Sequence, residues 1–251
     1  SAEEQIVKPT APSPSEIEPF PGAEKETKAE PLEGGKRIVV MTDIHYLAES
    51  LTDGGDMFQS MVEHGDGKLT NYVREITDAA FEEIQLLTPD VLIISGDLSL
   101  QGEKRSHEEL AGRLDALERA GIAVVVIPGN HDINNPSAAV YSGMDRYPAE
   151  PTTPADFVSI YSEFGYSEAN SRDIHSLSYT YDLGPSMRLL MLDTCQYEPR
   201  NRVGGMIKTE TYEWIDKELR TVSSFCPWPT ITCWRKARYM WMTVPLSTVR
   251  N

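Results

Sequence analysis

The sequence predicts an α/β fold, and three observations support this prediction. Short apolar runs rich in valine and isoleucine occur at residues 36–42, 91–95 and 122–127, a pattern typical of buried strands. Stretches with the three- and four-residue spacing of an amphipathic helix separate these runs. A strand–helix–strand order of this kind favours parallel strands with helices packed on the faces of the sheet.

The elements are expected in the following order. After the first strand, the Gly- and Asp-rich residues 46–68 predict a long loop. A helix is expected over residues 69–87, because Val73, Ile76, Ala80, Ile84 and Leu87 share one helical face and Pro89 lies just beyond it. After the second strand, residues 103–120 predict an amphipathic helix closed by Gly121.

The second half of the chain has a different pattern. Residues 177–182 and 187–193 predict two paired strands around the turn at Gly184 and Pro185. A helix is expected over residues 209–220. We therefore place the folded domain at residues 36–220.

Composition excludes some classes of protein. The net charge of −16 argues against binding to a nucleic-acid duplex, which requires basic surfaces along the phosphate backbone. No apolar run approaches the roughly 18 residues of a transmembrane helix. Three cysteines are too few for a disulfide framework in 251 residues.

Residues 1–35 differ from the rest of the chain. They contain six prolines, eight glutamates and three lysines, and almost no apolar periodicity. Such a segment cannot bury enough surface to offset its ordering entropy, so we expect a disordered linker. A tether of this composition suits an extracellular or cell-surface bacterial enzyme, although a trimmed tail on a cytoplasmic protein fits equally well.

Polar clusters follow each of the three early strands. In an open α/β sheet the carboxyl ends of the strands form the ligand-binding crevice, so these clusters should converge. Aspartate and histidine two residues apart on an extended segment can both reach one ion, and mixed nitrogen and oxygen ligands suit Mn, Fe or Zn. Any one cluster alone is weak evidence, whereas all three in this order are specific. The clusters are Asp43-Ile44-His45, Gly96-Asp97 and Gly129-Asn130-His131-Asp132.

This set of motifs resembles the first three blocks of the calcineurin-like metallophosphoesterase family. The resemblance covers about residues 36–220 and implies a β-sandwich flanked by helices around two divalent metal ions. It implies that Asp43 and His45 bind the first metal, that Asp97 bridges both metals and that Asn130 binds the second. His131 would protonate the leaving group and Asp132 would orient His131, while a hydroxide activated by the metals attacks phosphorus in line.

The resemblance also bears on the substrate. Family members that act on phosphoproteins carry an arginine soon after the second block, and residues 96–102 (GDLSLQG) contain none. We therefore expect a small phosphate-ester substrate, and the chain looks more similar to the bacterial cyclic-nucleotide phosphodiesterases of the family.

Other residues are expected to have ordinary structural roles. We expect His64 and His107 to face solvent and Cys195 to be a buried or half-buried side chain. His175 lies outside any matching motif and is given no role.

The segment 221–251 departs from the family pattern. It contains no aspartate or glutamate, and no histidine follows His175, whereas the family has two further histidine-containing blocks. We interpret this segment as out of frame from about Ser224. Another reading frame forces Leu at codons 225/226 and Val-Asp-Asp at codons 240–243, and it allows a strand that runs into His-His.

Two functional hypotheses follow. The first is a metal-dependent phosphoesterase. The alternative is a catalytically impaired remnant or binding module that holds at most one metal weakly. We expect an incomplete core to expose apolar surface and to favour self-association.

Overall fold

The computed structural model describes residues 35–65, 67–185, 187–225, 230–232 and 243–245. The chain divides into two units, Ser1–Gly35 and Lys36–Asn251, and the second contains every element described below. The predicted linker at residues 1–35 lies outside the described residues apart from Gly35, as does most of the segment 221–251. In the described part of the chain, no helix combines the length and apolar character needed to span a bilayer.

Three parallel strands form the centre of the fold. They are β1 (Ile38–Met41), β2 (Val91–Ser95) and β3 (Ala123–Ile127), in that spatial order. The register places Val40 beside Ile93 and Ile93 beside Val125. All three predicted strands and their parallel pairing are confirmed, and the near-continuous burial of β2 and β3 explains their unbroken apolar runs.

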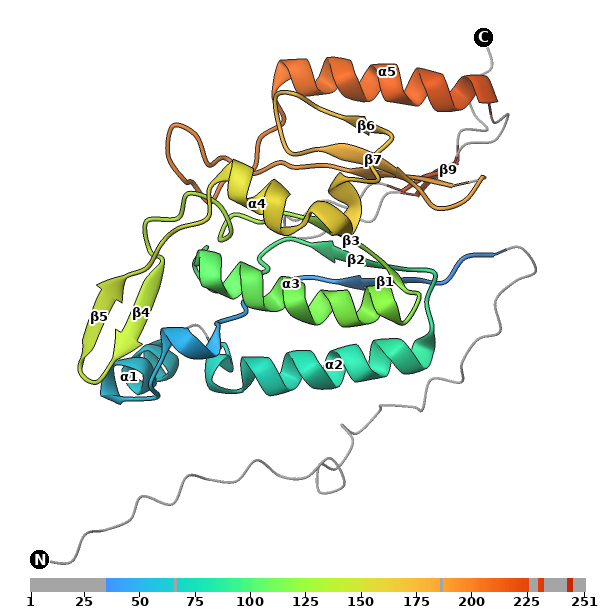
Figure 1. Cartoon of the computed structure of the whole chain (residues 1–251). Coiled ribbons are helices and arrows are strands. Elements are labelled where there is room, and N and C mark those ends of the chain that lie inside the picture. Colours follow the sequence, from blue (N-terminus) through green and yellow to red (C-terminus); the bar gives the residue numbers. More distant parts are fainter. Residues whose placement is uncertain (1–34, 66, 186, 226–229, 233–242, 246–251) are drawn as a thin grey trace, which may run out of the picture. The chain divides into compact units, whose positions relative to one another are not determined.

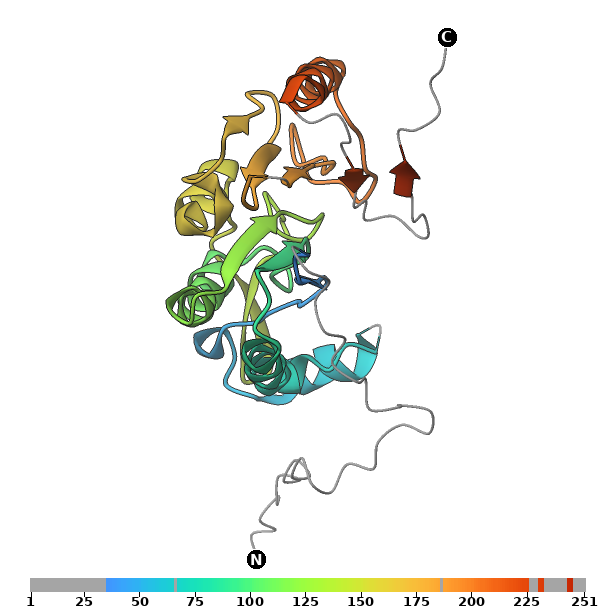
Figure 2. The same cartoon turned by 90° about the vertical axis from the view of Figure 1, so that its right-hand side faces the viewer.

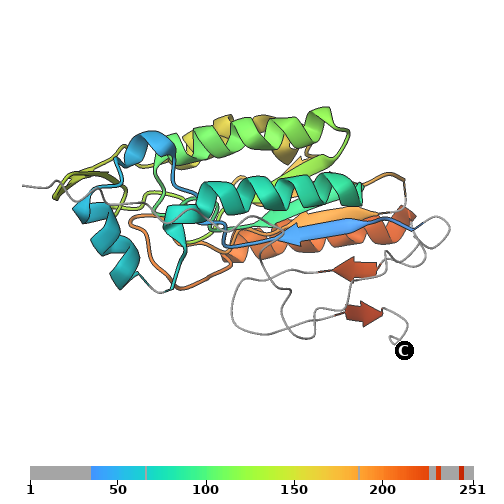
Figure 3. The same cartoon turned by 90° about the horizontal axis from the view of Figure 1, so that it is seen from below.

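Two helices lie side by side over one face of this sheet (Figures 1 and 3). The helix α2 (Val73–Leu87) follows a short 3₁₀ turn, η2 (Thr70–Tyr72), and the second helix is α3 (Lys104–Arg119). Their apolar stripes face the core through Phe81 and Ile84 of α2 and through Leu110, Leu114 and Leu117 of α3. Both predicted helices are confirmed.

A second sheet packs on the opposite face of the first (Figures 1 and 2). Its antiparallel strands are β6 (Ser171–Arg172), β7 (Tyr179–Asp182) and β8 (Arg188–Met191). The fully buried Tyr179 donates a hydrogen bond of 2.8 Å to the Val126 carbonyl and so joins the two sheets. Because α5 (Thr209–Phe225) covers the outer face, the order is helix–sheet–sheet–helix, and the expected flanked β-sandwich is confirmed.

The prediction of a long loop at residues 46–68 is wrong. This stretch contains η1 (Glu49–Leu51) and α1 (Asp56–His64). The Asp53 carboxylate accepts backbone N–H groups from Gly55 and Gly143, at 2.8 and 2.7 Å, which ties the start of α1 to a distant turn. Glycine and aspartate therefore begin a helix here, and the apolar spacing of Met57, Phe58, Met61 and Val62 was the overlooked signal.

Several further elements were not anticipated from the sequence. The turn at Gly143 joins β4 (Ala139–Ser142) to β5 (Asp145–Pro148), and this hairpin packs on α1. A capping box of Thr153 and Asp156 begins α4 (Pro154–Ile160), which leads into the π-helical turn η3 (Ser162–Tyr166). Beyond α5, β9 (Thr230–Thr232) pairs with β10 (Thr243–Pro245).

Candidate metal centre

The polar loops after β1 and β2 run side by side and are joined through their backbones. Asp43 donates its N–H to the Gly96 carbonyl at 3.1 Å, and His45 donates to the Asp97 carbonyl at 3.0 Å. The parallel pairing of the strands thus continues into the loops, which fixes the positions of both motifs relative to each other.

Three side chains from the three loops meet at one point. Ligand atoms of His45, Asp97 and His131 all lie within 4.8 Å of one another. The rings of His45 and His131 pack edge to face with centroids 4.7 Å apart. His45 Nε2 lies 4.0 Å from Asp97 Oδ2, and Asp97 is 3% exposed. The predicted convergence of three distant motifs is therefore present.

Asp43 lies at the open side of this cluster. Its Oδ1 atom is 3.7 Å from His45 Nε2, and its other oxygen accepts a hydrogen bond of 2.6 Å from the Thr42 hydroxyl. The Asp43 side chain is 43% exposed, whereas that of His45 is 11% exposed. The cluster therefore has one solvent-facing carboxylate and a largely buried interior.

The backbone at the cluster adopts an uncommon conformation. Asp43, His45 and Asp97 have φ values of 57°, 51° and 48°, in the left-handed region that residues other than glycine seldom occupy. These are three of the five such residues in the described part of the chain. Backbone strain of this kind persists where the surrounding structure enforces it and is concentrated at functional sites.

Gly129 is required for the loops to approach each other closely. A Cβ atom on Gly129 would lie 2.0 Å from Asp97 Oδ1 and 2.1 Å from the Asp97 backbone nitrogen. No side chain fits at that distance, so the third loop can reach Asp97 only with glycine at this position.

The His131 ring is held by a backbone carbonyl. His131 Nδ1 lies 2.7 Å from the Leu100 oxygen, and because a carbonyl only accepts, Nδ1 carries the hydrogen. The His131 N–H donates to Asp97 Oδ1 at 3.1 Å. His131 Nε2 is therefore the ring atom that is left to bind a metal or to exchange a proton.

In the described part of the chain the Asp132 carboxylate makes no hydrogen bond or ion pair with the His131 ring, in contrast to the role that the resemblance implied. Its fully buried carboxylate accepts N–H groups of Leu98, Ser99 and Gly129, at 3.2, 2.9 and 2.7 Å. The bonds from Leu98 and Ser99 tie the third loop to the segment that follows Asp97, and the bond from Gly129 closes the third loop on itself. Asp132 thus orients the loops, and the Leu100 carbonyl orients the imidazole.

His107 is fully buried, so the prediction that it faces solvent is wrong. It lies on the same stripe of α3 as Leu110 and Leu114, which is a signal that the sequence contained. Its Nε2 donates to the Asp132 carbonyl at 3.2 Å, and its Nδ1 accepts from the Tyr161 hydroxyl at 2.9 Å. Burial lowers the pKa of His107, which favours the neutral ring that these bonds require.

The cluster fits a divalent metal ion. It offers carboxylate oxygens and imidazole nitrogens, the donor set that suits Mn, Fe or Zn. His45 Nδ1 is buried and has no hydrogen-bond partner among the described residues, which is costly for a polar atom unless a further ligand is present. His45, Asp97 and His131, with Asp43 at the open side, are therefore the residues that could hold a metal.

Comparison with known proteins agrees with this geometry. Residues 36–241 match the calcineurin-like phosphoesterase family profile. The chain belongs to this family. Members of this family of hydrolases generally use divalent metals, and the match runs past residue 220 into the segment 221–251.

Two curated proteins are similar to this member of the family. A probable cyclic nucleotide phosphodiesterase of Synechococcus sp. is 27% identical over 146 residues, which are 58% of this chain and 43% of that protein. A probable cyclic nucleotide phosphodiesterase of Moraxella catarrhalis is 23% identical over 155 residues, 62% of this chain and 47% of that protein. The matched parts thus span less than half the length of these relatives.

Asn130 directly precedes His131 in the third loop. It lines a small cavity together with Gly129, Thr194 and Cys195, and its backbone carbonyl accepts from the Asn201 side chain at 2.7 Å. Cys195 is half-buried, as predicted. His64 and His175 are exposed and lie outside the His45–Asp97–His131 cluster, so the expectation for His64 is confirmed.

Glu103, at the start of α3, makes the stability of the domain depend on pH. This carboxyl group is buried, and one of its oxygens has no partner among the described residues. Burial raises the pKa of Glu103 from its usual 4.5 to about 7. Folding therefore favours the protonated form, so stability falls as pH rises from about 4.5 to 7, and the full loss of about 3 kcal/mol is present above pH 7.

We expect Glu103→Gln to remove this dependence. Urea unfolding of both proteins at pH 4 and pH 8 measures it, and the stability of the variant relative to wild type should rise by about 3 kcal/mol between these values. A difference that does not change with pH would show that Glu103 is ionised in the folded protein throughout.

Proposed function

We propose that the chain carries the metal-binding half of a phosphodiesterase that acts on small phosphodiesters of the cyclic-nucleotide class. The convergence of His45, Asp97 and His131 within 4.8 Å is the observation that carries this proposal. The names of the two relatives support the substrate class, and the cluster supports the metal dependence.

Each residue of the cluster has a proposed role. Asp43 and His45 would hold one divalent ion, Asn130 would hold a second, and the Asp97 carboxylate would serve both. The imidazolium form of His131 would give its Nε2 proton to the oxygen that leaves phosphorus. The Leu100 carbonyl supports this role because it binds the Nδ1 hydrogen and leaves Nε2 as the atom that exchanges a proton. Divalent ions bound here would acidify water and neutralise the negative charge that develops on the phosphoryl oxygens.

The histidines also support the alternative, a catalytically impaired chain. All five lie in the described residues, and His45 and His131 are the two at the cluster. His107 is committed to Asp132 and Tyr161, while His64 and His175 are exposed elsewhere. The proposed metal ligands are four side chains, those of Asp43, His45, Asp97 and Asn130. Four ligands fit one weakly held ion better than two ions.

Hydrolysis of bis-p-nitrophenyl phosphate and of 3′,5′-cyclic AMP, with and without Mn²⁺, tests both hypotheses. The chain should be compared with a version in which the reading frame after Ser224 is restored. We expect Mn²⁺-dependent turnover in the restored protein and much weaker turnover in this chain. Equal activity of the two would refute the impairment, and no Mn²⁺-dependent activity in either would refute the phosphodiesterase.

A further inference from the structure

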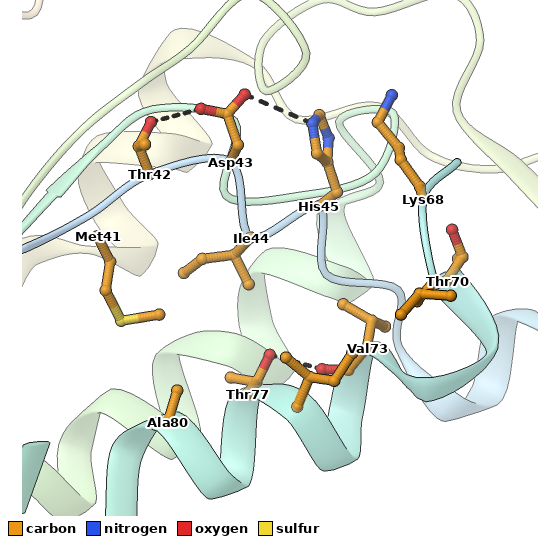
Figure 4. Close-up of a pocket in the computed structure, with 12 residues that line it drawn as sticks. Met41, Thr42, Asp43, Ile44, His45, Lys68, Thr70, Val73, Thr77 and Ala80 are labelled. Carbon is orange, nitrogen blue, oxygen red and sulfur yellow. Dashed lines mark hydrogen bonds and ion pairs between the residues drawn. The ribbon is translucent and has the colours of Figure 1, made fainter. Parts of the chain in front are cut away.

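A pocket of about 330 Å³ opens directly beside the metal cluster (Figure 4). It lies between the carboxyl end of β1 and the first turns of α2, and Asp43 and His45 form part of its wall. Its volume is at the lower end of the range for pockets that bind small molecules. A molecule bound here would therefore contact the residues that we expect to hold the metal.

The two sides of the pocket differ in chemistry. In Figure 4 the Asp43 carboxylate, the His45 ring and the Lys68 side chain lie on one side, and the apolar groups lie opposite. Thr77 does not alter this apolar character, because its hydroxyl is bonded to the Val73 carbonyl at 2.6 Å within α2. The apolar residues that line the pocket are Met41, Ile44, Leu69, Val73, Ile76 and Ala80.

Lys68 is the cationic residue among those that line the pocket. It is half-buried, and no ion pair with an acidic side chain is present for it within the described parts of the chain. In a chain with a net charge of −16, a lysine that has no ion pair among the described residues and lines the same pocket as Asp43 is placed to bind an anion.

We propose that this pocket is the binding site for the organic group of the substrate. A phosphate ester has an anionic end and an organic end, and the pocket has the same polarity. The phosphate lies between the metal cluster and the Lys68 ammonium, and a planar apolar group such as a nucleobase packs against Met41, Ile44 and α2. This inference rests on the proposed function and adds to it the residues that select the substrate.

Isothermal titration calorimetry of the Mn²⁺-loaded chain with two ligands tests this inference. Inorganic phosphate reports on the anionic part of the site alone, and adenosine 5′-monophosphate reports on the anionic and apolar parts together. We expect the nucleotide to bind at least about 10-fold more tightly than phosphate, because only the nucleotide fills the apolar side. Ala80→Phe places a ring in the pocket and should remove this difference while the affinity for phosphate stays unchanged.

Ala79→Phe is the matched control. Ala79 is the exposed neighbour of Ala80 on α2 and does not line the pocket, so this variant should bind both ligands as wild type does.

A second variant, Lys68→Met, keeps the length of the side chain and removes its charge. We expect it to weaken the affinity for both ligands by about 10-fold at low ionic strength. Lys68 is only half-buried, so this second variant tests the site even if Ala80→Phe fails to fold.

The possible failures are distinguishable. If wild type binds phosphate and nucleotide equally, or if Ala80→Phe and Ala79→Phe have the same effect, the pocket does not bind the organic group and this inference is overturned. Unchanged affinities in Lys68→Met would overturn the role of Lys68. If the chain binds neither Mn²⁺ nor phosphate, the proposed function fails and the inference falls with it.

Discussion

Replacing Asp97 with asparagine is expected to weaken Mn²⁺ binding by at least about 10- to 100-fold. The change removes the negative charge of a carboxylate that is 3% exposed and lies within 4.8 Å of both histidines of the cluster. It keeps the size of the side chain, so packing against Gly129 changes little. Equilibrium dialysis with metal analysis measures the effect directly.

Asp115→Asn is the matched control for Asp97→Asn. Asp115 is an exposed residue of α3 that pairs with Arg119 one helical turn away and is not part of the metal cluster. Exposed pairs of this kind contribute little, so neither Mn²⁺ binding nor stability should change measurably. Equal losses in the two variants would mean that overall charge, and not ligation by Asp97, governs metal binding.

Gly129→Ala is expected to destabilise the domain by about 3 kcal/mol or more, as overpacking without room to relax does. The added Cβ would meet Asp97 Oδ1 at 2.0 Å and the Asp97 backbone nitrogen at 2.1 Å. The loops after β2 and β3 must then separate, which also weakens the bonds from the Leu98 and Ser99 N–H groups to the Asp132 carboxylate. Urea unfolding measures the stability, and loss of Mn²⁺ affinity should accompany it.

The control for Gly129→Ala is Gly112→Ala. Gly112 lies inside α3, and a Cβ there would meet nothing within 4 Å. Alanine is favoured over glycine in a helix, so we expect this variant to be more stable than wild type by about 0.5–1 kcal/mol. If Gly129→Ala behaved like Gly112→Ala, the close approach of the two loops would be refuted.

The parallel sheet and its two covering helices could be predicted because each depends on local pattern. Residues 91–95 form a strand with the predicted bounds, since a continuous apolar run of five residues has few alternatives in a layered α/β domain. The convergence of His45, Asp97 and His131 was also predictable, because the carboxyl ends of parallel strands meet at one edge of the sheet.

Other features depend on contacts between distant residues, for which local sequence patterns are an incomplete guide. The Leu100 carbonyl that holds His131 is a backbone atom, which any residue could supply. The helix α1 begins where Asp53 bonds to Gly143, 90 residues away in the chain. The position of His107 on the apolar stripe of α3 indicated burial, but its polar side chain suggested exposure. The hydrogen-bond partners that allow it to be buried, Asp132 and Tyr161, are distant in the sequence.

Titration of the chain with Mn²⁺, followed by electron paramagnetic resonance of the free ion, tests the central claim most directly. Wild type and the double variant His45→Ala/Asp97→Asn should be compared at equal concentration, with circular dichroism to confirm that both are folded. We predict that wild type removes at least one equivalent of Mn²⁺ from solution and that the folded double variant removes none. Equal uptake by the two, or no uptake by wild type, would contradict a metal centre at the meeting point of the three strand-end loops.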